Sequence, residues 1–141
     1  MYRTSVHVQY RILALTREGL VSEALWDPGS DIAHLTPEGI EARTSKESGW
    51  VTLSVALEAG PVPAPAGHEF VTTLNEFTAG QAQLHVLSWG ERHDPIVLPD
   101  SWVDTPLTVQ WSANRVPEYW EAAAPPAEEH HVAMWQTFTA T

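Results

Sequence analysis

The sequence predicts an all-β fold, a two-sheet antiparallel β-sandwich of the jelly-roll kind with about eight short strands and at most one short helical turn. Three observations support this class. Apolar residues recur at every second position in several short segments, glycine and proline punctuate the chain, and no segment sustains a 3.6-residue period. Because 141 residues is the size of one domain, we expect residues 1–141 to form a single sandwich.

The first strands are expected close to the N-terminus. Apolar residues there alternate with polar ones, which is typical of a strand with one buried face; they are Val6, Val8, Tyr10, Ile12 and Ala14. Turn-forming residues at 16–19 predict that residues 20–26 return as the second strand of a hairpin.

A turn and two further strands follow in the predicted order. At Thr36-Pro37-Glu38 we expect a turn and no long helix, because Gly39 occupies the position at which a capping box has Glu or Gln. The next strand has its alternating residues at Ile40, Ala42 and Thr44. The most regular strand spans residues 50–58, and its predicted buried face consists of Val51, Leu53, Val55 and Leu57.

The second half of the chain continues the same pattern. Alternate prolines make residues 60–67 an extended loop, and residues 70–77 and 81–89 are predicted to form a second hairpin around residues 78–80. Residues 96–98 lie between prolines and suit a short edge strand. Two last strands are expected, with alternating residues at Leu107, Val109, Trp111 and Ala113, and at Val132, Met134, Gln136 and Phe138. Residues 116–131 between them are predicted to be a loop.

The charge of the chain is acidic and uneven. The formal net charge is −11, and residues 47–141 hold only Arg92 and Arg115 against twelve carboxylates. This balance argues against nucleic-acid binding, which needs clustered Lys and Arg to neutralise phosphates. The carboxylates either keep the protein in solution or form a face for a basic protein partner.

The lack of cysteine removes several classes of protein. A chain with no cysteine holds no disulfide scaffold, thiolate metal site, thiol redox centre or cysteine nucleophile. The N-terminal residues show no continuous apolar run suited to a signal peptide or a membrane span. We therefore expect a cytoplasmic protein without a membrane partner.

The spacing of the histidines and the known catalytic motifs give little support for a metal site or an enzyme. No His-x-His spacing occurs, and a polar junction between a loop and a strand explains the best cluster, Glu128-Glu129-His130-His131, as well as a metal site does. There is no nucleophile elbow, phosphate loop, dinucleotide fingerprint or zinc-protease motif. We expect no catalytic residue, no metal and no cofactor, and do not predict an enzyme.

Tryptophan is the unusual component, with seven residues in the chain. We expect Trp111 and most of the others in the core. Two tryptophans instead lie in proline-bounded segments, each with carboxylates beside it, as in a hot spot for a basic partner. Packing of the loops on the core is the alternative. The predicted binding residues are Asp100, Trp102, Asp104, Glu118, Trp120 and Glu121.

Three segments resemble the competence J family of bacterial nuclease inhibitors. They are an early strand with Val8-Gln9-Tyr10, the stretch from His34 to Arg43, and a terminal strand around Met134-Trp135. The aromatic-proline ending typical of that family is absent, because Gln136 follows Trp135. The resemblance implies a β-sandwich that inhibits a nuclease through protein–protein contact.

The sequence leaves three hypotheses of function. The first is a non-catalytic inhibitor or immunity protein whose acidic face covers a basic, nuclease-like partner. The second is a small-ligand or carbohydrate-binding sandwich with an exposed tryptophan as a stacking platform. The third is an enzyme that uses acids from loops at the strand ends.

Overall fold

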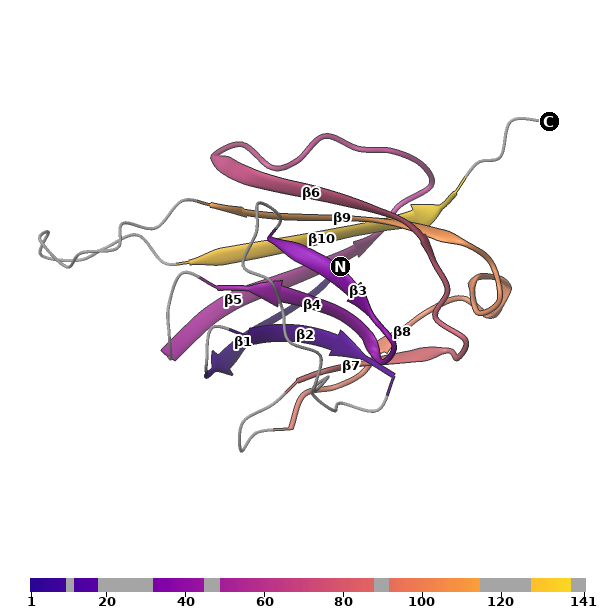
Figure 1. Ribbon diagram of the computed structural model, residues 1–141, viewed down its shortest axis with the longest axis horizontal. Coiled ribbons are helices and arrows are strands. Elements are labelled where there is room, and N and C mark those ends of the chain that lie inside the picture. The colour runs from indigo at the N-terminus through magenta and orange to yellow at the C-terminus, as the bar shows by residue number, and fades with distance from the viewer. Residues whose placement is uncertain (10–11, 18–31, 45–48, 88–91, 115–127, 138–141) are drawn as a thin grey trace, which may run out of the picture.

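The computed structural model describes residues 1–9, 12–17, 32–44, 49–87, 92–114 and 128–137. These residues form ten strands in two five-stranded sheets and one short 3-10 helix, η1 (Asp100–Trp102). Figure 1 shows the two sheets lying one over the other. The predicted all-β two-sheet sandwich is therefore confirmed, with more strands than the eight or so expected.

The two sheets, named A and B here, each contain strands from distant parts of the chain. Sheet A has the order β1 (Tyr2–Val8), β5 (Gly49–Leu57), β10 (Glu129–Gln136), β9 (Leu107–Asn114) and β6 (His68–Phe77). Sheet B has the order β3 (Ala33–Thr36), β4 (Gly39–Arg43), β2 (Ile12–Thr16), β7 (Gln83–Val86) and β8 (Ile96–Val97). The sheets are mostly antiparallel, but β5 and β10 pair in parallel, with Val132 opposite Val55.

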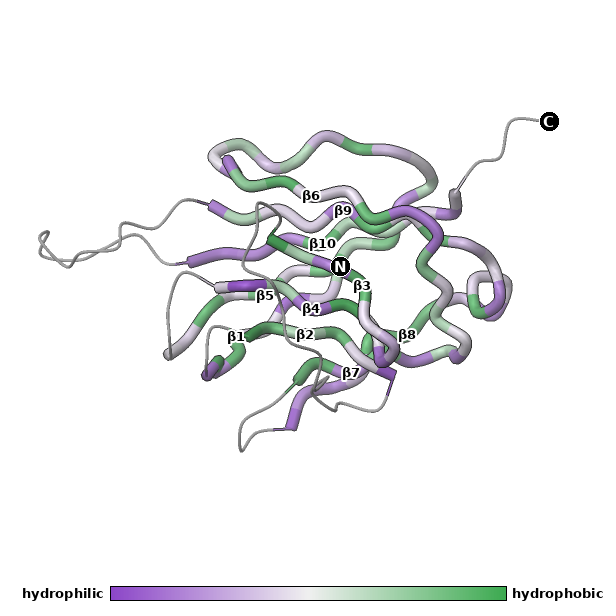
Figure 2. The backbone as a smooth tube through the Cα atoms, in the orientation of Figure 1, coloured by the Kyte–Doolittle hydropathy of each residue, from purple (hydrophilic) through white to green (hydrophobic). Residues whose placement is uncertain are grey.

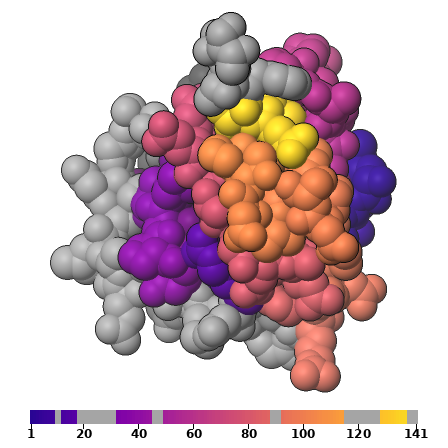
Figure 3. Space-filling model, turned by 90° about the vertical axis from the view of Figure 1, so that its right-hand side faces the viewer, coloured from indigo at the N-terminus to yellow at the C-terminus, as the bar shows by residue number. Residues whose placement is uncertain are grey.

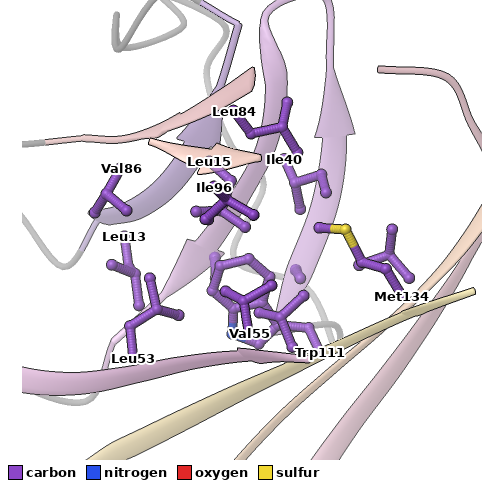
Figure 4. Packing of buried hydrophobic residues seen from close by; sticks show 14 of the residues in the cluster. Leu13, Leu15, Ile40, Leu53, Val55, Leu84, Val86, Ile96, Trp111 and Met134 are labelled. Carbon is purple, nitrogen blue, oxygen red and sulfur yellow. The ribbon is translucent and has the colours of Figure 1, made fainter. Parts of the chain in front are cut away.

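The core lies between the sheets and is built from alternate residues of their strands. Figure 2 shows hydrophobic and hydrophilic stretches alternating along the chain, as expected of strands with one buried face. Figure 4 shows Leu13, Leu15 and Ile40 from sheet B facing Leu53 and other side chains from sheet A. All four are fully buried.

The first predicted strand is in fact two strands in different sheets. β1 contributes Val6 and Val8 to the core of sheet A, whereas β2 contributes Leu13 and Leu15 to sheet B. The residues that join the core cluster therefore change from even to odd numbers between the two strands. This shift of the core-facing positions by one residue accompanies the turn between β1 and β2. The sequence does not reveal the turn, because its apolar residues keep alternating without a break. The predicted return strand at 20–26 lies outside the described residues.

The turn at Thr36-Pro37-Glu38 is confirmed as the connection of β3 and β4. Thr36 Oγ1 accepts hydrogen bonds from the backbone N–H of Glu38 at 3.2 Å and of Gly39 at 3.0 Å. Gly39 also packs against β2, where an added Cβ would lie 2.2 Å from the Leu15 carbonyl oxygen. A side chain at this position would therefore separate β4 from β2.

The predicted face of the long strand holds for three residues of four. Val51, Leu53 and Val55 are buried, but Leu57, the last residue of β5, is 37% exposed. β5 ends at Leu57, and residues 60–67 form the predicted extended loop before β6.

The predicted hairpin of residues 70–77 and 81–89 is wrong. β6 pairs with β9 in sheet A, whereas β7 pairs with β2 and β8 in sheet B. Residues 78–80 therefore cross between the sheets, and Ala79 is fully buried in the core on the way. The short edge strand near residues 96–98 is confirmed as β8.

The last two strands occupy the centre of sheet A. β9 buries Leu107, Val109, Trp111 and Ala113 as predicted, and β10 buries Val132 and Met134. β10 begins at Glu129, inside the segment predicted to be a loop. The remainder of that segment up to residue 127, and Phe138, lie outside the described residues.

Candidate functional site

One end of the sandwich gathers three connecting segments around a single arginine. The guanidinium of Arg17 donates to the carbonyl oxygens of Pro37 at 2.8 Å, Thr78 at 2.6 Å and Ala79 at 2.9 Å. It also lies over the Phe77 ring, 5.7 Å from the ring centre. Arg17 thus holds the β3–β4 turn against the crossover between β6 and β7.

The η1 loop joins this arrangement through the backbone. The Gly80 N–H donates to the carbonyl of Val103 at 2.9 Å, which ties the crossover to the loop that precedes β9. The three segments gather at the right-hand end of Figure 1 and are visible together in Figure 3, which faces that end.

Among the described residues, this end of the sandwich carries four carboxylates, which we call the loop-end surface: Glu38, Glu76, Asp100 and Asp104. Glu76, Asp100 and Asp104 are exposed, and Glu38 is half-buried. The Arg17 guanidinium keeps its positive charge while it donates to three neutral carbonyl groups, but four carboxylates outnumber this one cation. The surface therefore presents negative charge on a rigid support.

The structure describes three of the six residues predicted to bind a partner. Asp100 and Asp104 are exposed at the loop-end surface, with Trp102 between them. Trp102 is half-buried and packs against the hydrophobic core, so packing of the loop on the core accounts for the buried part of its ring. The other three predicted residues, Glu118, Trp120 and Glu121, lie outside the described residues.

Sequence reasoning missed Glu38 and Glu76 as members of this surface. Each lies next to a residue that Arg17 contacts. Glu38 follows Pro37, whose carbonyl oxygen accepts from Arg17, and Glu76 precedes Phe77, whose ring packs against the guanidinium. The turn at Thr36-Pro37-Glu38 was a usable signal, because it predicted that Glu38 lies at a strand end. Nothing in the sequence indicated that Arg17 joins this turn to the crossover between β6 and β7.

Behind the turn, a cross-strand pair of ionisable residues is held in mostly neutral surroundings. His34 Nε2 lies 3.4 Å from Glu41 Oε2, and the Glu41 side chain is only 4% exposed. Burial, with a smaller contribution from Glu38, raises the pKa of Glu41, and burial lowers the pKa of His34. Both shifts favour the uncharged forms of the two side chains.

The polar cluster at Glu128–His131, for which no metal was predicted, contains a buried hydrogen-bond relay. Trp111 Nε1 donates to His130 Nδ1 at 2.9 Å, and His130 Nε2 lies 2.6 Å from Glu128 Oε2. Because the indole N–H can only donate, Nδ1 of His130 accepts and the ring proton lies on Nε2, which donates to Glu128. Both ring nitrogens are thus engaged, and no group of three or more candidate metal ligands occurs among the described residues.

A second polar group lies on the outer face of sheet A, at the end of β10 where Glu129 begins the strand. His68 Nδ1 is 3.0 Å from Ser112 Oγ, and His68 Nε2 is 3.9 Å from Glu129 Oε2. The order of residue types is that of an activated serine, but Ser112 is completely buried and has no access for a substrate. Burial lowers the pKa of His68 and of His131, with opposing contributions from Glu129 and Glu58 respectively.

The tryptophans differ in exposure from the expected pattern. Trp111 is fully buried as predicted, and Trp135 is 6% exposed. Trp50 is 51% exposed and meets His7 edge-to-face with ring centres 5.3 Å apart. A stacking platform for a sugar would therefore involve Trp50 more readily than Trp102.

Helices capable of spanning a membrane were sought over the described part of the chain, and none is long and apolar enough.

Comparison with known proteins gives a likeness of fold. No protein-family model matches the chain, and no curated protein matches it in sequence. A solved structure superposes over almost the whole of both chains, with a TM-score of 0.68 across 97% of this chain and 96% of the other. The class defined by this likeness is a two-sheet β-sandwich found in an inhibitor protein.

The matching structure is that of ComJ from Bacillus subtilis, an inhibitor of the DNA-degrading activity of NucA. The resemblance to the competence J family inferred from the sequence is thus confirmed at the level of the fold. Sequence identity is 8%, so the similarity is one of structure.

Proposed function

We propose that this chain is a non-catalytic, acidic interaction protein that inhibits a basic, nuclease-like protein by covering its nucleic-acid-binding surface. The observation that carries the proposal is the loop-end surface, whose four carboxylates lie on segments joined by the Arg17 hydrogen bonds and by the Gly80–Val103 backbone hydrogen bond. The fold shared with an inhibitor of a DNA-degrading activity supports the same reading. The proposal retains the expected cytoplasmic location.

The physical basis is the substitution of carboxylates for phosphates. A nuclease binds DNA through clustered Lys and Arg, which attract any rigid array of negative charge. A fixed array loses little conformational entropy on binding, because its loops are already ordered. Trp102, between Asp100 and Asp104, would then contribute the exposed part of its ring at the centre of the contact.

Capture followed by an activity assay tests the proposal. The immobilised chain is exposed to lysate of the native host at low and at high salt, and captured proteins are identified and purified. We expect a captured protein that is basic and degrades DNA, and that loses this activity when an equimolar amount of the chain is added. Captured proteins no more basic than the lysate average, or undiminished DNA degradation, would contradict the proposal.

Two matched triple variants test the role of the loop-end surface. Glu38→Gln, Asp100→Asn and Asp104→Asn together should slow association about 10-fold and flatten its salt dependence, because they remove long-range attraction. The control combines Glu58→Gln, Asp94→Asn and Glu129→Gln, which change the net charge equally on other elements. Equal slowing by both triples would show that net charge alone, and not this surface, guides binding.

A further inference from the structure

β6 is the longest strand at an edge of the sandwich. It has ten residues, and among the described strands it pairs only with β9. The edge strands of sheet B, β3 and β8, have four and two residues. An edge strand leaves a row of backbone N–H and C=O groups available to another chain, and short edge strands limit that row.

The opposite edge of sheet A is closed by side-chain contacts. On β1, Tyr2 Oη donates to the carbonyl of Asp94 at 2.8 Å, and Thr4 Oγ1 lies 3.2 Å from His93 Nδ1. Arg3 between them places a charge near the start of the strand. Charged residues and covering segments are usual protections of a sheet edge, so β1 has both.

Within the described part of the chain, β6 shows neither protection along its central stretch. Residues 70–75 carry no charge, and the register with β9 is unbroken from Phe70 to Leu74, with irregularities only on either side. Phe70 is 43% exposed and Val71 is 47% exposed, and Figure 2 shows hydrophobic colour in this strand between hydrophilic ends.

The two sides of β6 are occupied differently. On the inner side, the Ile32 N–H donates to Thr72 Oγ1 at 3.2 Å, so the start of β3 lies against this side chain. Val71 and Thr73 lie opposite Ser112 and Gln110, and therefore project from the outer face of sheet A. Both are exposed.

The charges that flank this stretch select the kind of strand that fits. Glu69 and Glu76 bracket residues 70–75. If a second copy paired antiparallel about a two-fold axis between Thr72 and Thr73, Glu69 of each copy would come near Glu76 of the other, at the irregularities that flank the regular register. Like charges directly opposite destabilise a strand pair, whereas cations at these positions stabilise it.

We propose that the edge of β6 accepts an extended segment of a basic protein partner, with β-branched or apolar residues in its centre and Lys or Arg at each end. Backbone hydrogen bonds would hold the segment, and the flanking charges would select it. The identification of the partner as the nuclease-like protein rests on the proposed function. The preference for a basic-flanked strand does not.

Synthetic peptides test the preference directly. The probe is Lys-Val-Thr-Val-Thr-Val-Thr-Lys, compared with the same peptide carrying Glu at both ends. We expect the Lys-flanked peptide to slow hydrogen exchange of backbone amides within residues 70–75, and to bind at least about 10-fold more tightly than the Glu-flanked peptide. The amides of β1 should not change.

A charge reversal provides the matched test. In the double variant Glu69→Lys and Glu76→Lys, the preference should invert, so that the Glu-flanked peptide binds more tightly. Arg3→Glu on β1 should leave the order of the two peptides unchanged. Backbone amide spectra of each variant establish that the fold persists, and the comparison of the two peptides on the unaltered chain needs no variant at all.

Several results would overturn the inference. They are equal binding of the two peptides, protection confined to the loop-end surface, or a dimer of this chain that protects residues 70–75 in the absence of peptide. A captured nuclease that is inhibited without any protection of β6 would also overturn it, while leaving the proposed function intact. Selective peptide binding at β6 with no nuclease captured would instead refute only the proposed function.

Discussion

Removal of His130 tests the buried relay most directly. The ring is 1% exposed and joins Trp111 and Glu128 at 2.9 and 2.6 Å. In His130→Ala, the indole N–H loses its acceptor, which costs about 1–3 kcal/mol for a buried donor. Breaking a buried pair that includes a carboxylate costs about 3–5 kcal/mol.

These two costs overlap, because water that enters the emptied space can satisfy part of both groups. We therefore expect His130→Ala to lower the free energy of unfolding by about 3–5 kcal/mol, out of a total of about 5–15 kcal/mol for a domain. The assay is urea unfolding followed by circular dichroism.

The adjacent residue supplies the control. His131 is half-buried and projects from the opposite face of β10, so His131→Ala should cost much less. A loss below about 1 kcal/mol for His130→Ala, or equal losses for the two variants, would show that the relay does not stabilise the fold.

Three other predictions follow from the core, the Glu41 site and the histidines. Leu53 is fully buried between the sheets, so Leu53→Ala should lower the free energy of unfolding by about 2–5 kcal/mol, and a loss under about 0.5 kcal/mol in denaturant would contradict its assignment to the core. Because burial raises the pKa of Glu41 above its ordinary value of 4.5, the unfolded chain releases this proton more readily and stability falls as pH rises through the folded pKa. Glu41→Gln should therefore raise the melting temperature at ~pH 7 and lose this advantage below ~pH 4, whereas a constant gain would point to another cause. Since both ring nitrogens of His130 are engaged within the fold, thermal melts with and without a strong chelator should superimpose, and a chelator-induced drop would indicate a metal.

Period-two patterning predicted which residues are buried better than it predicted which sheet holds them. Val51, Leu53 and Val55 face the core as expected, because alternation is a local property of one strand. The hairpin predicted around residues 78–80 failed for a different reason. A short Gly-containing link suits a hairpin and a crossover equally well, and the buried Ala79 that decides between them looks like any small turn residue.

The candidate site shows the same division between local and long-range information. Asp100 and Asp104 were predicted from their position beside Trp102, and both are exposed. Glu38 joins them only because Arg17 bonds the Pro37 carbonyl and the crossover at once. Contacts of this kind depend on the order of strands in space, which no pattern within a single segment encodes.

The position of β10 has a consequence for how the protein acquires its structure. In the strand order, β10 lies between its parallel partner β5 and its antiparallel partner β9, so β5 and β9 do not pair with each other. During synthesis, β1 with β5 and β6 with β9 can form two separate pairs, but nothing joins these pairs until the chain that follows residue 128 has emerged. The pairing of β10 with β5 and β9 thus forms late and closes a long loop, and such non-local pairing slows folding. Until that moment, the growing chain has two unfinished half-sheets with open edges, and unpaired strand edges of this kind favour aggregation.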